Sequence, residues 1–261
     1  MSQTGSDDHG RLSVQTYDYA LFGDVEEHAI DGLHQVMARR MTASWREVPH
    51  VTHFDEVDIT DLDARRRARN DVAGEDAPRL SLLAFIVSAV SGALHEFPDF
   101  NASIDPNGET LYRKKYRNIG MAVDTDMGLL VPVLRNVEDM DLADIASSIT
   151  ALAARARGGK LKNEDIEGAS FTVTSLGRLG GTGFAPIINA PEVAILGVSR
   201  AAMRPAVFEH RVVPRLMLPL SLSYDHRVID GAAAGRFMET LRKRLLDLAK
   251  SMTDDEAALP V

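Results

Sequence analysis

The sequence contains no cysteine, which excludes disulfides, thiolate metal sites and a cysteine nucleophile. It also lacks any apolar run near the ~18 residues that would cross a bilayer. The polar, acidic start MSQTGSDDHGRLS is typical of neither a signal peptide nor an arginine-rich transit peptide. We therefore expect a cytoplasmic protein without a membrane partner.

Positive charge is scarce as well. Lysine and arginine number 29 against 38 aspartates and glutamates, which gives a formal net charge of −9. A net negative charge disfavours sequence-independent binding to the phosphate backbone of nucleic acids, so we expect no nucleic-acid partner. Two short basic clusters occur at residues 65–67 and 113–115. They fit either a solvated surface or a local patch for an anionic ligand such as a nucleotide phosphate.

What the chain does have is length and a regular apolar pattern. Its 261 residues suffice for one large domain or two small ones, and a hydrophobic share of 45% is ordinary for a protein with a buried core. Apolar residues at helical spacing predict helices over 28–46, 80–96, 141–157 and 231–250, and a charged helix is expected over 62–72. Alternation or short apolar runs predict strands over 50–60, 110–117, 118–124, 129–134, 170–174, 192–199, 206–213 and 216–224. This order indicates an α/β (or α+β) domain with a mixed sheet.

The ends differ from this central part. Residues 1–18 form a polar leader that we expect to be disordered, residues 19–250 form the domain, and residues 251–261 form an acidic tail. Asp141 is the expected N-cap of the helix over 141–157. The loop over 175–191 is rich in glycine but lacks the lysine and the spacing of a phosphate-binding loop.

The most informative segment follows the apolar run at 216–222. It reads Ser-Tyr-Asp-His-Arg-Val-Ile-Asp-Gly and places His226 four residues before Asp230, with Gly231 next. Imidazole is the side chain whose ordinary pKa lies nearest neutrality, so His226 is a candidate general base. From this motif alone, a hydrogen-bonded core histidine remains an equal alternative. His50 and His53 could suggest a metal pair, but their spacing on a strand points them to opposite faces, so no metal site is predicted.

Six blocks in order carry a resemblance to a known family: residues 45–55, 118–124, 128–133, 171–177, 186–198 and 221–231. Over residues 19–248 the chain resembles the catalytic domain of the dihydrolipoamide acyltransferases, the core subunits of 2-oxo acid dehydrogenase complexes. The blocks Pro-His-Val-Thr-His-Phe-Asp and Asn-Ala-Pro-Glu-Val-Ala-Ile-Leu-Gly-Val are most similar to the pyruvate branch, which transfers acetyl groups.

The resemblance implies a fold, an assembly and a reaction. The fold is the two-layer sandwich of chloramphenicol acetyltransferase, and the assembly is a homotrimer whose active sites are tunnels between subunits. The glycine-rich loop is then interpreted as a mobile segment that lines the tunnel. The reaction moves an acyl group between a dihydrolipoyl thiol and coenzyme A, both as substrates, without a metal.

The resemblance also implies roles for particular residues. His226 becomes the base that takes the proton of the attacking thiol. Asp230 is expected to pair with an arginine, for which Arg40 is the candidate, or to cap the last helix. The hydroxyl of Thr174, with Ser175 beside it, would stabilise the oxyanion from a neighbouring subunit. The alternative for Thr174 is an inward-facing threonine of a strand. Asp225 would support the site.

The chain departs from full-length members of this family. Residues 1–18 are too short for a lipoyl domain and contain no lysine to lipoylate, and no peripheral subunit-binding domain is recognisable. We expect either a core fragment or, slightly favoured, a natural short gene. Its lipoyl carrier would then act in trans, with 2-oxo acid dehydrogenase and dihydrolipoamide dehydrogenase subunits as further partners. The acidic residues 254–256 favour a trimer over a larger cubic shell.

Two rival functions remain open at the level of sequence. One is an acetyltransferase of the same fold that acts on a small hydroxyl acceptor. The other is a scaffold subunit that builds a core without catalysis, although such a subunit has no need for the histidine present here at position 226.

Overall fold

The computed structural model describes residues 18–74, 77–177, 180–208 and 210–256. The chain divides into two units, Met1–Val36 and Met37–Val261. In the first unit the described part holds a short 3-10 helix, Tyr19–Leu21, whose Asp18 side chain accepts a hydrogen bond from the Ala20 amide at 3.2 Å. The predicted disordered leader, residues 1–17, and the end of the predicted tail, residues 257–261, lie outside the described residues.

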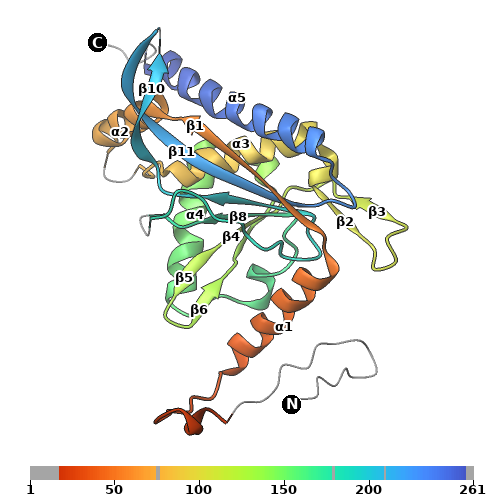
Figure 1. Cartoon of the computed structure of the whole chain (residues 1–261). Coiled ribbons are helices and arrows are strands. Elements are labelled where there is room, and N and C mark those ends of the chain that lie inside the picture. Colours follow the sequence, from red (N-terminus) through yellow and green to blue (C-terminus); the bar gives the residue numbers. More distant parts are fainter. Residues whose placement is uncertain (1–17, 75–76, 178–179, 209, 257–261) are drawn as a thin grey trace. The chain divides into compact units, whose positions relative to one another are not determined.

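A large mixed sheet organises the second unit (Figure 1). Its strand order is β1-β11-β9-β8-β4-β7, and β10 pairs with β11. The bounds are β1 His50–Asp58, β4 Ile119–Met121, β7 Val133–Leu134, β8 Phe171–Ser175, β9 Ala194–Val198, β10 Ala202–Phe208 and β11 Arg211–Asp225. Strand β8 runs parallel to both β4 and β9, whereas the other pairs are antiparallel. This arrangement confirms the predicted mixed sheet.

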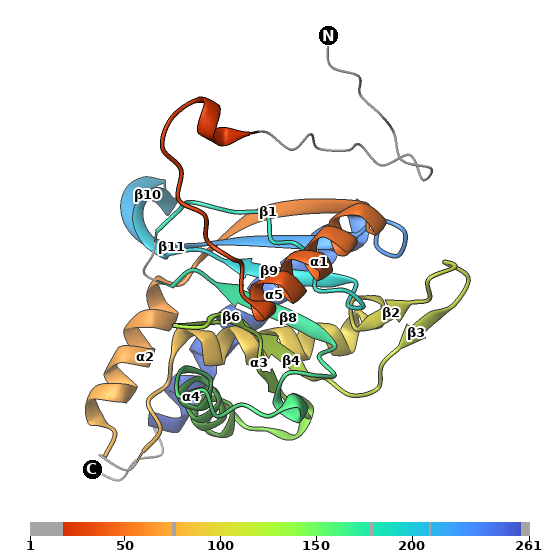
Figure 2. The ribbon, with the colours of Figure 1, turned by 90° about the horizontal axis from the view of Figure 1, so that it is seen from below.

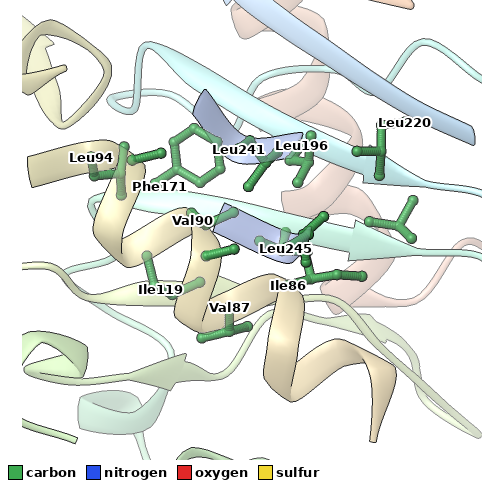
Figure 3. Close-up of a cluster of buried hydrophobic side chains, with 14 of the residues drawn as sticks. Ile86, Val87, Val90, Leu94, Ile119, Phe171, Leu196, Leu220, Leu241 and Leu245 are labelled. Atoms are coloured by element: carbon green, nitrogen blue, oxygen red, sulfur yellow. The ribbon is translucent and has the colours of Figure 1, made fainter. Parts of the chain in front are cut away.

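Helices cover one face of the sheet. They are α2 (Thr60–Val72), α3 (Leu82–Glu96), α4 (Leu142–Arg157) and α5 (Gly231–Glu256). Figure 3 shows α3 and α5 packing against the strands through one cluster of apolar side chains: Ile86, Val87, Val90, Leu94, Ile119, Phe171, Leu196, Leu220, Leu241 and Leu245. All of these side chains are buried, so this layer is the hydrophobic core. In the described part of the chain, no helix is both long and apolar enough to cross a bilayer.

The two faces of the sheet differ in chemistry because side chains alternate along a strand. On β8, Phe171 and Val173 enter the core, so Thr172 and Thr174 lie on the other face. On β11, Leu220 and Leu222 enter the core, and the serine between them lies opposite. The face opposite helices α2 to α5 therefore presents hydroxyl groups at the centre of the sheet.

A loop covers part of this hydroxyl-bearing face. The ring of Phe184 lies against Gly197 of β9, where an added Cβ would come within 2.9 Å of the ring and 2.5 Å of the Ser221 hydroxyl. A side chain at position 197 would displace the loop from the strand, which accounts for the glycine there. Beside this contact, Val48, Ile188 and Ile195 form a second, smaller buried apolar cluster.

Several predicted elements are confirmed. Helix α4 has Asp141 as its N-cap, with the carboxylate accepting from the Asp144 amide at 2.7 Å. Helix α3 is buried on most sides, as its apolar sequence predicted, and Ser81 caps it. Helix α1 (Gly32–Glu47) begins later than the predicted start at residue 28, and α5 continues beyond the predicted end at residue 250.

The prediction for residues 206–213 was wrong. They were expected to form one strand, but they contribute to both arms of the β10–β11 hairpin, in which Ala206 pairs with Val213. Pro205 and Pro214 face each other in this hairpin. Proline is tolerated at the edge of a sheet, and among the described strands β10 pairs with β11 alone.

The region before β7 is also more divided than predicted. Figure 2 shows β2 (Ala102–Ile104) and β3 (Leu111–Arg113) as a separate hairpin that projects from the large sheet. We did not predict β2. The predicted strands over 118–124 and 129–134 each break in two, because β5 (Val123–Thr125) and β6 (Gly128–Leu130) leave the large sheet and pair with each other.

Candidate active site

His226 stands at the end of the longest strand. It directly follows β11, its side chain is exposed in this chain, and its ring centroid lies 5.9 Å from that of Tyr224. The His226 amide donates a hydrogen bond to the carbonyl of Pro49, next to the start of β1, at 3.1 Å. The main chain at His226 is thus fixed while the imidazole faces outward. This placement excludes the core-histidine alternative and leaves the ring accessible to a bound molecule.

Asp225 shapes the turn that carries His226. It is only 1% exposed, and its carboxylate accepts from the Arg227 amide at 3.0 Å and from the Arg227 guanidinium at 2.6–3.1 Å. This hydrogen bonding raises the pKa of Arg227 above its usual value. The Asp225 carbonyl accepts from the amides of Val228 and Ile229, both at 3.0 Å. Asp225 therefore acts on the turn through Arg227 and the backbone.

Asp230 caps helix α5. Its carboxylate accepts from the Ala233 amide at 2.7 Å, an N-cap geometry that satisfies one of the free amides of the first helical turn. Burial and the charge of Asp230 together raise the pKa of the neighbouring Tyr224 hydroxyl. Among the ion pairs of the described residues, none joins Asp230 to Arg40. The structure contains the cap, and the pairing of Asp230 with an arginine stays a prediction.

Arg40 instead faces a different carboxylate. It is exposed on α1, and its positive charge acts on Glu192, where it opposes a rise in the pKa of that group. Glu192 belongs to the turn before β9, and the next residue, Val193, accepts a hydrogen bond from the Asp225 amide at 2.8 Å. The charge of Arg40 thus acts on the segment beside the strand end.

Thr174 and Ser175 lie at the end of β8, and both are half-buried. The Ser175 hydroxyl accepts from the Gly177 amide at 3.2 Å, at the start of the glycine-rich loop. Thr174 lies on the hydroxyl-bearing face, beside Gly197 in the parallel register with β9. The inward-facing alternative for Thr174 is therefore excluded, since the core side of β8 belongs to Phe171 and Val173.

The register of the sheet separates Thr174 from His226 within one chain. Thr174 lies beside Gly197, and Gly197 lies beside Ser221, five residues before His226 on β11. Five residues of strand cover roughly 17 Å, and two strand spacings add roughly 10 Å sideways. The two side chains are thus about 20 Å apart in one copy. They can act on one substrate only if they come from different copies.

A buried polar cluster lies close to this site and was not predicted. Glu192 is 4% exposed, and its carboxylate accepts from the Asn189 amide group at 3.0 Å. The Lys114 side chain approaches it from the segment after β3. Burial raises the pKa of Glu192 to about 7, against the opposing effects of Thr172, Lys114, Asn189 and Arg40. Burial also lowers the pKa of Lys114, while the charge of Glu192 counteracts that change.

Several residues of the two basic clusters have partners within the protein. Arg66 and Arg67 both pair with Asp63 at 2.7 Å, on the same helix. Arg113 pairs with Asp99 at 2.5 Å, and Lys114 is half-buried with its Nζ atom out of reach of solvent. Consecutive basic residues thus occupy different environments, which composition alone could not reveal.

The stability of the protein is expected to fall between pH 5 and pH 8 because of Glu192. A carboxyl group with a folded pKa of about 7, above its ordinary 4.5, stabilises the fold in its protonated form. That contribution is fully present below the unfolded pKa and is lost as the pH rises through the folded pKa, on the order of 3 kcal/mol. Glu192→Gln should flatten this loss, as measured by urea unfolding at both pH values.

The matched control is Glu109→Gln, which removes an exposed carboxylate of the β2–β3 hairpin loop. It should keep the pH dependence of the wild type. An equal loss of stability with pH in the wild type and in Glu192→Gln would mean that Glu192 is not the group that titrates.

Comparison with known proteins agrees with this arrangement. The model of the family 2-oxoacid dehydrogenases acyltransferase (catalytic domain) matches residues 22–253. The chain belongs to this family. The match covers the large sheet, its helices and the turn that carries His226.

Similar members of the family are named as components of pyruvate dehydrogenase complexes. The dihydrolipoyllysine-residue acetyltransferase component from Pseudomonas aeruginosa is 52% identical over 235 residues, which cover 90% of this chain and 43% of that relative. The component from Azotobacter vinelandii is 51% identical over 231 residues, 88% of this chain and 36% of that relative. The chain thus spans less than half the length of these two relatives.

Solved structures give the same family and fold. A structure of the Azotobacter vinelandii dihydrolipoamide acetyltransferase has 48% identity and a TM-score of 0.87, and the match covers 92% of this chain and 98% of that one. Chloramphenicol acetyltransferase, at 17% identity, has a TM-score of 0.50 over 84% of this chain and 100% of its own. The predicted two-layer fold of the chloramphenicol acetyltransferase type is confirmed.

Proposed function

We propose that this chain transfers an acyl group, most readily acetyl, between a dihydrolipoyl thiol and coenzyme A. The observation that carries the proposal is the exposed His226 at the end of β11. It stands in a chain 52% identical to a relative named as a dihydrolipoyllysine-residue acetyltransferase component. Both thiols are substrates in this reaction, and no step requires a metal.

The proposed role of His226 follows from the chemistry of thiols. With an ordinary pKa of about 8.5, only a few per cent of a thiol is ionised at neutral pH. His226 takes the proton as the sulfur forms a bond to the thioester carbonyl carbon. When the tetrahedral intermediate collapses, the bond to the original sulfur breaks, and the imidazolium returns its proton to that leaving thiolate.

The negative oxygen of the intermediate needs a donor, and Thr174 is the proposed one. The Azotobacter vinelandii structure is described as an investigation of a serine, a histidine and an asparagine in the catalytic mechanism of that enzyme. In that enzyme the serine precedes the histidine and the asparagine follows it. Counting the same numbers of residues back and forward from His226 leads to Thr174 and Asp230. Threonine keeps the hydroxyl of serine. Asp230 carries a charge where that enzyme has a neutral amide, and it would support the turn as the cap of α5.

Assembly is part of the proposal because Thr174 and His226 of one chain lie about 20 Å apart by the register of the sheet. We infer a homotrimer in which Thr174 of one copy serves His226 of the next, with Ser175 beside the hydroxyl and Asp225 and Arg40 supporting the strand end. A related structure is described as the cubic core of the pyruvate dehydrogenase multienzyme complex, so trimers could join into a larger core.

The remaining partners are proposed from the same relatives. A lipoyl-bearing domain would deliver the acyl group, and the dehydrogenase components of a pyruvate dehydrogenase complex would load and reoxidise it. We place the protein in the cytoplasm, which agrees with the absence of cysteine from its sequence.

The test is an assay of the wild-type protein with acetyl-CoA and free dihydrolipoamide, followed by the loss of the coenzyme A thioester. We expect turnover of at least about 1 s⁻¹, in the ordinary range for enzymes. Propionyl-, isobutyryl- and succinyl-CoA, assayed in parallel, should react more slowly. Transfer to a small alcohol but not to dihydrolipoamide would indicate the other acetyltransferase class, and no transfer to either acceptor would indicate a scaffold subunit.

A further inference from the structure

His50, the first residue of β1, uses both of its ring nitrogens within the protein. Nδ1 lies 2.8 Å from the Val48 carbonyl, and Nε2 lies 2.9 Å from the amide nitrogen of Ile188. A carbonyl only accepts and an amide only donates, so Nδ1 carries the proton and Nε2 accepts. Only the neutral ring in this tautomer satisfies both bonds. No lone pair is left for a metal ion, which removes the His50–His53 metal pair as an alternative.

Ile188 is held by side chains in place of secondary structure. It is fully buried in the small cluster with Val48 and Ile195. Its amide donates to His50, and its carbonyl accepts from the Ser44 hydroxyl of α1 at 2.6 Å. A buried backbone group without a partner is unfavourable, so the two side chains fix where the loop before β9 can sit.

The same loop reaches the strand end that carries His226. Its last residue, Val193, accepts from the Asp225 amide at 2.8 Å, and the His226 amide donates to the carbonyl of Pro49 at 3.1 Å. The main chain around His226 is thus hydrogen-bonded both to Val193 and to Pro49. His50 connects the segments that carry these two residues, since it follows Pro49 directly and accepts a hydrogen bond from Ile188 of the loop.

We propose that His50 is a positioning residue that locks the segment from Ile188 to Val193 onto the start of β1 and thereby fixes the backbone of His226. The expected effect of His50 on catalysis rests on the acyltransferase function proposed above. The effect of His50 on the position of the loop does not depend on that function. Loss of the bond from Ile188 to His50 frees the loop at one side of the strand end. The imidazole of His226 is then less often aligned with the thiol.

Two substitutions separate the hydrogen bond from the shape of the ring. His50→Phe keeps an aromatic ring beside Trp45, whose centroid lies 5.4 Å from that of His50, but provides no acceptor. His50→Gln places an amide oxygen near the position of Nε2 and can accept from Ile188 again. We expect His50→Phe to lower kcat about tenfold with little change in the KM for acetyl-CoA, because misplacement of a catalytic group by about 1 Å slows the chemical step. His50→Gln should recover most of that loss.

Amide hydrogen exchange, measured on peptides that cover residues 184–193 and 224–230, tests whether His50 fixes the loop and the backbone of His226. This measurement does not depend on enzymatic activity. His50→Phe should speed exchange in both peptides, and His50→Gln should do so less. Ser44→Ala, which removes the other bond to Ile188, should speed exchange in the first peptide. His53→Gln is the matched control on the same strand, and no side-chain hydrogen bond of His53 occurs among the described residues. This control should match the wild type.

Wild-type exchange in both peptides of His50→Phe would overturn the proposal, as would a wild-type kcat of this variant in an active enzyme. If the wild-type protein transfers no acyl group, the proposed function fails, and the exchange comparison still decides what His50 does. If His50→Phe does not fold, His50→Gln and Ser44→Ala decide the question: equal exchange in these two variants and in the wild type would contradict the proposal.

Discussion

Replacement of His226 by alanine should lower kcat for acetyl transfer by about 10²- to 10⁴-fold, the usual contribution of a general base. The imidazole is exposed at the end of β11, where a thiol can reach it, so its loss should not disturb the core. Steady-state assays with acetyl-CoA and dihydrolipoamide measure the effect. The deficit should shrink as the pH approaches the thiol pKa of about 8.5, because the substrate then ionises without help.

His53→Ala serves as the control for this experiment, since it removes a half-buried histidine on the neighbouring strand β1 and should leave kcat near the wild-type value. A wild-type rate for His226→Ala at neutral pH would show that another group takes the proton. The same melting temperature in the wild type and in the variant would attribute a lowered rate to chemistry and not to unfolding.

Phe237→Ala should have the largest effect on stability, a loss of about 3–5 kcal/mol in the free energy of unfolding. The Phe237 ring on α5 is 0% exposed and stacks on Phe100, with ring centroids 4.3 Å apart at 14°. Its ring centroid also lies 5.9 Å from that of Phe97, in a T-shaped arrangement, and 6.1 Å from that of Phe171 of β8. Its removal leaves a cavity among rigid rings that cannot close around it. Urea unfolding monitored by circular dichroism measures the change.

The control is Leu246→Ala on the same helix, where the side chain is 40% exposed. Alanine suits a helix, so this variant should lose about 1 kcal/mol or less. If the two variants were equally stable, the aromatic cluster around Phe237 would not be the tightly packed centre that its distances indicate.

Much of the fold could be predicted from local patterns. The buried helix α3, the capped helix α4 and the strand β1 follow from apolar spacing and from single residues such as Asp141. The hairpin of β10 and β11 could not be placed, because its prolines pair across an edge and do not end the strands. The spacing of apolar residues indicates which residues face the core. It does not indicate which strands pair or which turns lie next to the end of a strand.

The candidate site was predictable to a different degree. His226 and Thr174 stand out through sequence blocks, and the structure adds that they are far apart within one chain. The burial of Glu192 and of the Lys114 Nζ atom gives no signal in the sequence, since charged residues are ordinarily exposed. The role of Arg40 stays a prediction, because a helix residue chosen by resemblance does not reveal which carboxylates folding brings near it.

The alternation along β8 has a consequence for how this protein can change over evolutionary time. Phe171 and Val173 belong to the hydrophobic core, whereas Thr172 and Thr174 lie on the opposite face of the same short strand. The residues that hold the domain together and those on the hydroxyl-bearing face are therefore interleaved in sequence but separated in space. Side chains on that face can be exchanged while the other set keeps the protein folded.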